Sequence, residues 1–306
     1  MKWLKGITLF LIANVLIYLT LSVTASILIN VVLPAFGIDV RGAFNQQLLV
    51  WSLVIGFGGA FISLLFSKQM ARAMLHCQQI TEPRSHAEHV IYGSVKEIAQ
   101  RLNITMPEVW VYDAPDPNAF ATGPSKNNSM VAVSTGLLQN LKEDEVKAVL
   151  AHEMGHVYNG DMFTTTVLAG LMNTFVYYIS NLLASMVGQS SGDREEGGAA
   201  GNPILAMVVY FFLQIVLSFL AMIVVSWHSR RREYEADAFS AKVYGKQSMI
   251  GALQGIDRWV NRTQFEYSNQ DALATMKISG TTPGKIMSLV ATHPPIEARI
   301  AALQQL

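Results

Sequence analysis

Long apolar blocks dominate the pattern of this chain of 306 residues. Four segments contain no Asp, Glu, Lys or Arg, namely residues 6–38, 46–67, 162–192 and 197–229. A bilayer core of about 30 Å requires roughly 20 apolar residues in a helix, because no water is present there to satisfy a non-helical backbone. The pattern therefore predicts four transmembrane helices, near residues 6–30, 46–67, 163–187 and 203–227.

The two polar regions carry other periodicities. Residues 88–102 and 142–158 repeat apolar positions at helical spacing, and residues 108–112 and 129–134 resemble β-strands. Between these strands, residues 115–123 are rich in Pro, Asn and Gly and predict a loop. Further helices are expected at residues 231–244 and 248–261 and from about Pro294 onward.

Composition supports a membrane protein. Only 14% of the residues are charged, against about 25% in soluble domains. Lys and Arg together number 22, as do Asp and Glu, so no overall basic field favours nucleic acid as a partner. The lone Cys77 cannot form an intramolecular disulfide, which fits a reducing compartment.

The first apolar block has two readings. Lys2 and Lys5 precede it, and Val23-Thr24-Ala25 resembles a signal-peptide cleavage site. The apolar run continues to Leu33, which is longer than an ordinary signal sequence and favours a retained helix.

Positive charges gather at the same side of the four predicted spans. The charges are Lys2 and Lys5, Lys68 and Arg72, and Arg230-Arg231-Arg232. The excess of Lys and Arg in cytoplasmic loops then places both termini and both polar regions in the cytoplasm.

The helix over residues 142–158 contains His152-Glu153-Met154-Gly155-His156. Histidines four apart lie about 40° apart around a helix, so both rings can bind one ion. Glu153 points to the side, where it can take a proton from a water molecule that zinc activates. Gly155 costs roughly 0.5–1 kcal/mol there relative to Ala, which indicates that another backbone or a substrate comes close.

A catalytic zinc ion usually has three protein ligands and one open position. The strongest candidate for the third ligand is Glu233, in Glu233-Tyr234-Glu235-Ala236-Asp237. Asp237, one turn later, could accept a hydrogen bond from a ligand imidazole. The alternative is an acidic helix face that only balances Arg230 to Arg232. The two predicted spans between the half-sites return the chain to the same side of the membrane.

Several motifs in order resemble the HtpX family of bacterial membrane heat-shock proteases, within the superfamily that includes the CAAX prenyl endopeptidases. They are Asn118-Ala119-Phe120-Ala121-Thr122-Gly123, the His152 to His156 motif with Asn159-Gly160-Asp161, the Glu233 to Asp237 motif, and Thr292-His293-Pro294-Pro295 with Arg299. The resemblance covers essentially the whole chain.

This resemblance implies one Zn²⁺ per chain, with Glu233 as the third ligand and Glu153 as general base. It also implies that Asn118 and His293 line the cleft, where they could hydrogen-bond substrate or the developing oxyanion. The implied substrates are misfolded or unassembled membrane proteins or unfolded polypeptides, cut on the cytoplasmic side of the bacterial inner membrane. Other quality-control proteases of that membrane are candidate partners.

We therefore expect a mainly α integral membrane protein with four transmembrane helices and a cytoplasmic zincin-like protease domain with a small β-sheet. The expected parts are a transmembrane hairpin (1–68), a protease part (69–161), a second hairpin (162–228) and a helical part with the third ligand (229–306). A substrate would lie extended along an edge strand built from Ser129 to Ser134 or its neighbour.

Three other functions fit the sequence less well. A structural zinc site usually has four protein ligands, often cysteines, and none is obvious here. A transporter should carry ionisable groups within its spans, whereas the four apolar blocks have no Asp, Glu, Lys or Arg. A protease for prenylated C-termini would need a large membrane chamber, which four spans do not readily form.

Overall fold

The structure is a computed structural model that describes residues 46–190, 202–268 and 285–306 and the single positions Ser26, Val31 and Pro34. The chain divides into two compact units. One comprises Met1–Phe61 and Val167–Met222, and the other comprises Ile62–Thr166 and Ile223–Leu306. The first predicted transmembrane helix, residues 6–30, lies outside the described residues apart from Ser26.

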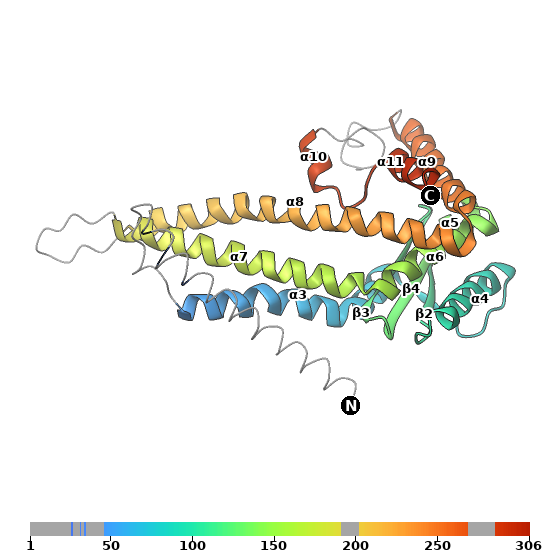
Figure 1. The fold of residues 1–306 in the computed structure, drawn as a ribbon, viewed down its shortest axis with the longest axis horizontal. Coiled ribbons are helices and arrows are strands. Elements are labelled where there is room, and N and C mark those ends of the chain that lie inside the picture. Colours follow the sequence, from blue (N-terminus) through green and yellow to red (C-terminus); the bar gives the residue numbers. More distant parts are fainter. Residues whose placement is uncertain (1–25, 27–30, 32–33, 35–45, 191–201, 269–284) are drawn as a thin grey trace, which may run out of the picture. The chain divides into compact units, whose positions relative to one another are not determined.

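Three helices among the described residues are long and apolar enough to cross a membrane. They are α3 (Gln46–Leu75), α7 (Asp161–Ser190) and α8 (Pro203–Tyr244), shown in Figure 1. The second, third and fourth predicted spans are thereby confirmed as apolar helices. Helix α8 continues without a break through the helix predicted separately at 231–244, so one helix carries both an apolar span and Glu233.

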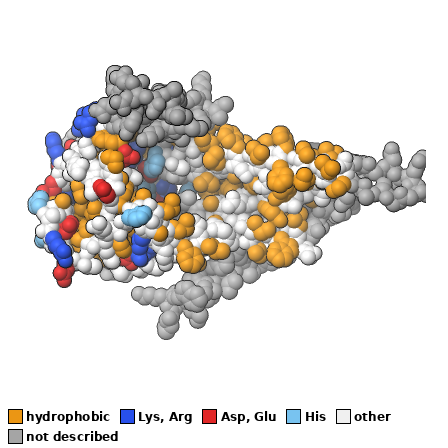
Figure 2. Space-filling view, turned by 180° about the vertical axis from the view of Figure 1, so that it is seen from behind, with side chains coloured by type: hydrophobic (Ala, Val, Ile, Leu, Met, Phe, Trp, Pro, Cys, Tyr) orange, Lys and Arg blue, Asp and Glu red, His pale blue; other side chains and the backbone are white. Residues whose placement is uncertain are grey.

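Helices α3 and α7 pack closely through small residues in the first unit. A Cβ atom added to Gly56 would lie 2.8 Å from Thr174 Cα, and one added to Gly170 would meet the Phe57 ring. Small residues permit such close approach in membrane helices, where packing drives association. Large apolar side chains such as Phe212 and Ile215 of α8 are exposed, and hydrophobic side chains cover much of the helical surface seen in Figure 2. This surface suits contact with lipid.

The second unit contains a four-stranded sheet in the order β1-β2-β4-β3. Strands β1 (Gln78–Gln79) and β3 (Ala119–Ser125) are the edges, and β2 (Glu108–Tyr112) pairs in parallel with β4 (Asn128–Ser134). Helices α4 (His86–Arg101) and α6 (Glu143–Asn159) pack against it through a shared apolar core. That core holds α6, the helix with both histidines, in place.

The structure corrects one prediction about this sheet and decides between the alternatives of another. A loop was expected at residues 115–123, but strand β3 begins within it and covers Ala119–Ser125, because pairing with β4 outweighs the weak strand propensity of Ala, Gly and Pro. The substrate edge was predicted at Ser129 to Ser134 or its neighbour, and strand β4 lies between β2 and β3, so Ser129 to Ser134 is not the edge. Among the described residues, its neighbour β3 is the edge strand that packs beside α6.

Four further helices belong to this unit. They are α5 (Thr135–Asn140), α9 (Lys246–Ser268), α10 (Lys285–Val290) and α11 (Ile296–Gln304). Ala148 of α6, Leu253 of α9 and Leu303 of α11 share one buried apolar cluster. This cluster fixes the helix that carries Arg299.

A partly buried ion-pair network joins the C-terminal part of α3 to the sheet. Lys68 Nζ donates to Glu108 Oε1 at 2.6 Å and to Asn128 Oδ1 at 2.8 Å, and Arg72 donates to Glu108 Oε2. Partial burial raises the pKa of Glu108, but the hydrogen bond and charge of Lys68 lower it more, so the pKa lies below its ordinary value. The ionised carboxylate therefore stabilises the folded state.

We expect Glu108→Gln to lower the free energy of unfolding by roughly 1–3 kcal/mol at pH 7, because buried Lys68 loses its counter-charge. A carboxylate whose pKa is depressed on folding contributes above its unfolded pKa of about 4.3, and the contribution is lost as pH falls through the folded value. Thermal unfolding in detergent should show the two proteins converging only below about pH 4. Glu82→Gln, at an exposed position, is the control. A difference in melting temperature that stays constant down to pH 3 would contradict the assignment.

Candidate metal centre

Helices α6 and α8 cross closely at the candidate site. A Cβ atom added to Gly155 would lie 3.4 Å from Ala236 Cα and 3.2 Å from the Phe239 ring. The absence of a side chain at Gly155 therefore permits the close approach of the α8 backbone. Ser240 Oγ of α8 also donates to the Ala148 carbonyl of α6 at 2.6 Å. This contact places Glu233 of α8 opposite the two histidines of α6.

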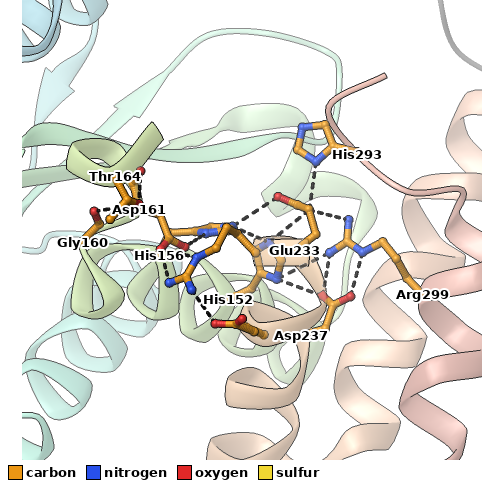
Figure 3. Close-up of polar contacts among 11 residues, drawn as sticks. His152, His156, Gly160, Asp161, Thr164, Glu233, Asp237, His293 and Arg299 are labelled. Carbon is orange, nitrogen blue, oxygen red and sulfur yellow. Dashed lines mark hydrogen bonds and ion pairs between the residues drawn. The ribbon is translucent and has the colours of Figure 1, made fainter. Parts of the chain in front are cut away.

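Three predicted ligands come together here. The Nε2 atoms of His152 and His156 are 3.2 Å apart, and Glu233 Oε1 lies 3.3 Å from His156 Nε2. One ligand atom from each residue lies within 4.8 Å of the others. Figure 3 shows the three side chains pointing toward one another. Two imidazoles and one carboxylate suit Zn²⁺ and leave a fourth position open for water or substrate.

A carboxylate holds each ring in the orientation that a metal ligand needs. His152 Nδ1 lies 2.9 Å from Asp237 Oδ1, and His156 Nδ1 lies 2.7 Å from Asp161 Oδ2. Because a carboxylate accepts hydrogen bonds, each Nδ1 donates and each Nε2 is left with its lone pair. The two Nε2 atoms, which carry these lone pairs, are the atoms of the two rings that lie 3.2 Å apart.

Asp161 and its partner Arg232 are the site residues that sequence reasoning did not select. Gly160 ends α6 in the left-handed conformation, with φ 72°, and Asp161 begins α7 directly after it. Arg232 Nε donates to Asp161 Oδ1 at 2.6 Å, and Arg232 also bonds Glu235. The sequence did contain a signal for Asp161, because this acidic residue directly follows Gly160, the glycine that ends the helix of His152 and His156.

Arg299 of α11 joins two acidic residues of α8, Glu233 and Asp237. Its Nε and Nη2 donate to both oxygens of Asp237, at 2.8 and 2.6 Å, and its Nη1 lies 3.1 Å from Glu233 Oε2. His293 Nδ1 lies 2.9 Å from the same Glu233 oxygen, although the His293 side chain is 68% exposed. The structure thus brings both residues to the Glu233 carboxylate, and Figure 3 shows them beside it.

Asn118 and Glu153 occupy different surroundings. The Asn118 backbone exchanges two hydrogen bonds of 2.9 Å with Ser134, one through the Ser134 hydroxyl, just before β3. These contacts do not involve the histidines, so a role for Asn118 in the cleft stays a prediction. Glu153 is partly buried and interacts with the charges of His152, His156 and Glu233. Burial raises the pKa of Glu153, and the two imidazoles oppose that rise.

The charges in the cluster fit a divalent cation. With neutral imidazoles, the ionised carboxylates of Glu233 and Asp237, whose pKa values are lowered, face the guanidinium of Arg299, since Arg232 neutralises Asp161. Burial lowers the pKa of His156, but hydrogen bonds with Asp161 and Glu233 raise it more, to about 10, so the site favours positive charge. Glu233 Oε1 lies 3.3 Å from His156 Nε2, while Oε2 lies beside Arg299 and His293.

We expect Asp161→Asn to weaken zinc binding about 10- to 100-fold, because the carboxylate that orients the His156 ring is lost. Competition with a chromogenic chelator in detergent measures the affinity. Asp144→Asn, an exposed change near the start of the same helix, is the matched control. Equal zinc affinities in the wild type and both variants would show that Asp161 does not support a metal ligand.

Comparisons with known proteins identify related chains. The profile of peptidase family M48 matches residues 86–306. Protease HtpX of Actinobacillus pleuropneumoniae is 43% identical over 302 residues, covering 99% of both chains. Protease HtpX of Tolumonas auensis is 42% identical over 303 residues, covering 99% of this chain and 100% of that one.

A solved structure has a related fold. The crystal structure of Ste24p from S. mikatae superposes with a TM-score of 0.58 and 19% sequence identity. The match covers 95% of this chain and 67% of Ste24p. At this identity the similarity concerns the fold alone.

Proposed function

This chain belongs to peptidase family M48 and is a membrane metalloprotease, and we propose from this that it is a zinc endopeptidase. Its proposed substrates are misfolded or unassembled membrane proteins, which it cuts at the cytoplasmic side of the bacterial inner membrane. The observation that carries the proposal is the convergence of His152, His156 and Glu233 ligand atoms within 4.8 Å, beside Glu153. His152, His156 and Glu233 would hold one zinc ion. When bound, zinc lowers the pKa of water and polarises a peptide carbonyl.

Glu153 is the general base in this proposal. Its carboxylate takes a proton from the attacking water and passes it to the leaving amine, which is the exchange that a side chain of raised pKa performs well near neutral pH. Asp237 and Asp161 keep the histidine rings oriented throughout. His293, exposed at the edge of the cluster, is placed to donate a hydrogen bond to the oxyanion that develops on the substrate carbonyl.

Strand β3 is the proposed binding edge for the substrate backbone. It pairs with β4 on one side and packs beside α6, the helix that carries Glu153. An extended peptide added to this edge makes backbone hydrogen bonds that accept many sequences. Unfolded segments offer free backbone groups and folded domains do not, which supports misfolded proteins as the substrate class.

The proposed membrane placement has four spans, with the site on the cytoplasmic side. The Arg231 guanidinium lies 5.4 Å from the centre of the exposed Trp227 ring, an aromatic and basic pair typical of the boundary between lipid and water. Glu233 follows on the same helix by less than two turns. The excess of Lys and Arg at this end supports the cytoplasmic side.

Zinc reconstitution and substrate comparison test the proposal. The protein would be stripped of metal with a chelator in detergent and given one equivalent of zinc. Cleavage of three separate substrates would then be compared: a destabilised membrane protein, its stable parent and a prenylated peptide. We expect the destabilised protein to be cut fastest. Preferred cleavage of the prenylated peptide would replace the substrate class, and no cleavage of any polypeptide at full zinc occupancy would overturn the hydrolytic function.

A further inference from the structure

The segment between α10 and α11 carries His293 to the metal centre. His293 Nδ1 lies 2.9 Å from Glu233 Oε2, but the side chain is 68% exposed, so packing around the ring does not hold it. Its position therefore depends on how the two ends of residues 291–295 are fixed. The C-terminal end leads into α11, where Arg299 binds Asp237 through two hydrogen bonds of 2.6 and 2.8 Å.

The N-terminal end is fixed by two other side chains of α8. Arg230 Nη1 donates to the carbonyl oxygens of Leu289 and Ala291, at 2.9 and 2.7 Å, and lies 3.5 Å from that of Ser288. Ser226 Oγ, buried, donates to the Val290 carbonyl at 2.9 Å. The last carbonyls of a helix lack partners within the helix and favour a cation, so Arg230 both caps α10 and ties it to α8.

These contacts all come from a single face of α8. Ser226, Arg230, Glu233 and Asp237 follow one another at intervals of four, three and four residues, which places them along one side of a helix. Two of them hold the segment before His293, and the other two contact the zinc-binding histidines or Arg299. The distance between His293 and Glu233 is thus set along one rigid element.

We infer that Arg230 is a positioning residue for hydrolysis, which acts by holding His293 at the Glu233 carboxylate where a substrate carbonyl would bind. This inference rests on the proposed function. Arg230 itself touches neither substrate nor metal. Its loss frees the end of α10 and lets the exposed imidazole move, and a misplacement of about 1 Å can cost about 10²-fold in rate.

A double-mutant cycle with His293 tests the inference. We expect Arg230→Ala to lower kcat roughly 10- to 100-fold, with little change in KM or in bound zinc, and His293→Ala to lower it at least as much. The double variant should be no slower than His293→Ala, because Arg230 acts through that ring. Arg231→Ala, which removes the neighbouring charge, should cleave at the wild-type rate.

Two further variants keep the test decisive. Arg230→Lys retains a cation near the α10 carbonyls and should recover part of the lost kcat, and it replaces Arg230→Ala if the alanine variant does not purify. A full additional loss from Arg230→Ala in the His293→Ala background, or an unchanged kcat for Arg230→Ala alone, would overturn the inference. The zinc-loaded wild type separates the two proposals: if it cuts no polypeptide, the proposed function fails, whereas a wild type that cleaves, with additive effects of Arg230→Ala and His293→Ala, overturns only the positioning role.

Discussion

Replacement of Glu153 by glutamine is expected to lower kcat for peptide hydrolysis by about 10²–10⁴-fold while zinc remains bound. Glutamine keeps the size of the side chain but cannot take up the proton of the attacking water. Glu153 lies beside His152 and His156 and is not among the three residues whose ligand atoms converge. Cleavage of an unfolded protein, with zinc content measured on the same samples, checks the expectation.

The control for this change should be the same substitution, glutamate to glutamine, on the same helix. Glu143→Gln serves, because Glu143 lies at the exposed start of α6 and pairs with Lys147. It should cleave at close to the wild-type rate. Loss of zinc from Glu153→Gln would instead make Glu153 a ligand, and equal cleavage by the wild type and Glu153→Gln would remove it from the reaction.

Glu233→Gln should have the second large effect, loss of stoichiometric zinc and with it of activity. The amide is a poor zinc ligand and also removes the negative charge that faces Arg299 and His293. Zinc analysis after gel filtration in detergent, at equal protein concentration, measures the loss.

Glu235→Gln is a close control for Glu233. It is two residues away on α8, and its exposed carboxylate bonds Arg232 outside the histidine cluster. We expect it to keep one zinc ion per chain. If Glu233→Gln also holds one tightly bound zinc ion, Glu233 is not the third ligand.

Much of this structure could be predicted from local patterns in the sequence. The His152 to His156 helix could be predicted because its period and both ligands lie within a few turns, and it forms α6 as expected. Strands β2 and β4 were recognised from their β-branched and apolar residues. Strand β3 was missed because its small residues have little strand preference, and its pairing with β4 is a tertiary effect.

Long-range ion pairs could not be predicted in the same way. The basic residues near the predicted spans were counted as charges that orient the chain, but the structure gives several of them particular partners. Lys68 binds Glu108, Arg232 binds Asp161, and Arg230 binds the end of α10. Which carboxylate or carbonyl meets each cation depends on the packing of helices that are distant in sequence, and no local period encodes it.

Zinc titration of the chelated wild-type protein tests the central claim most directly. Zinc would be added in fractions of one equivalent, and cleavage of an unfolded protein would be measured after each addition. A single catalytic centre at His152, His156 and Glu233 predicts a rate that rises in proportion to zinc and stops rising at one equivalent. Full cleavage before any zinc is added, or none when one equivalent is bound, would contradict it.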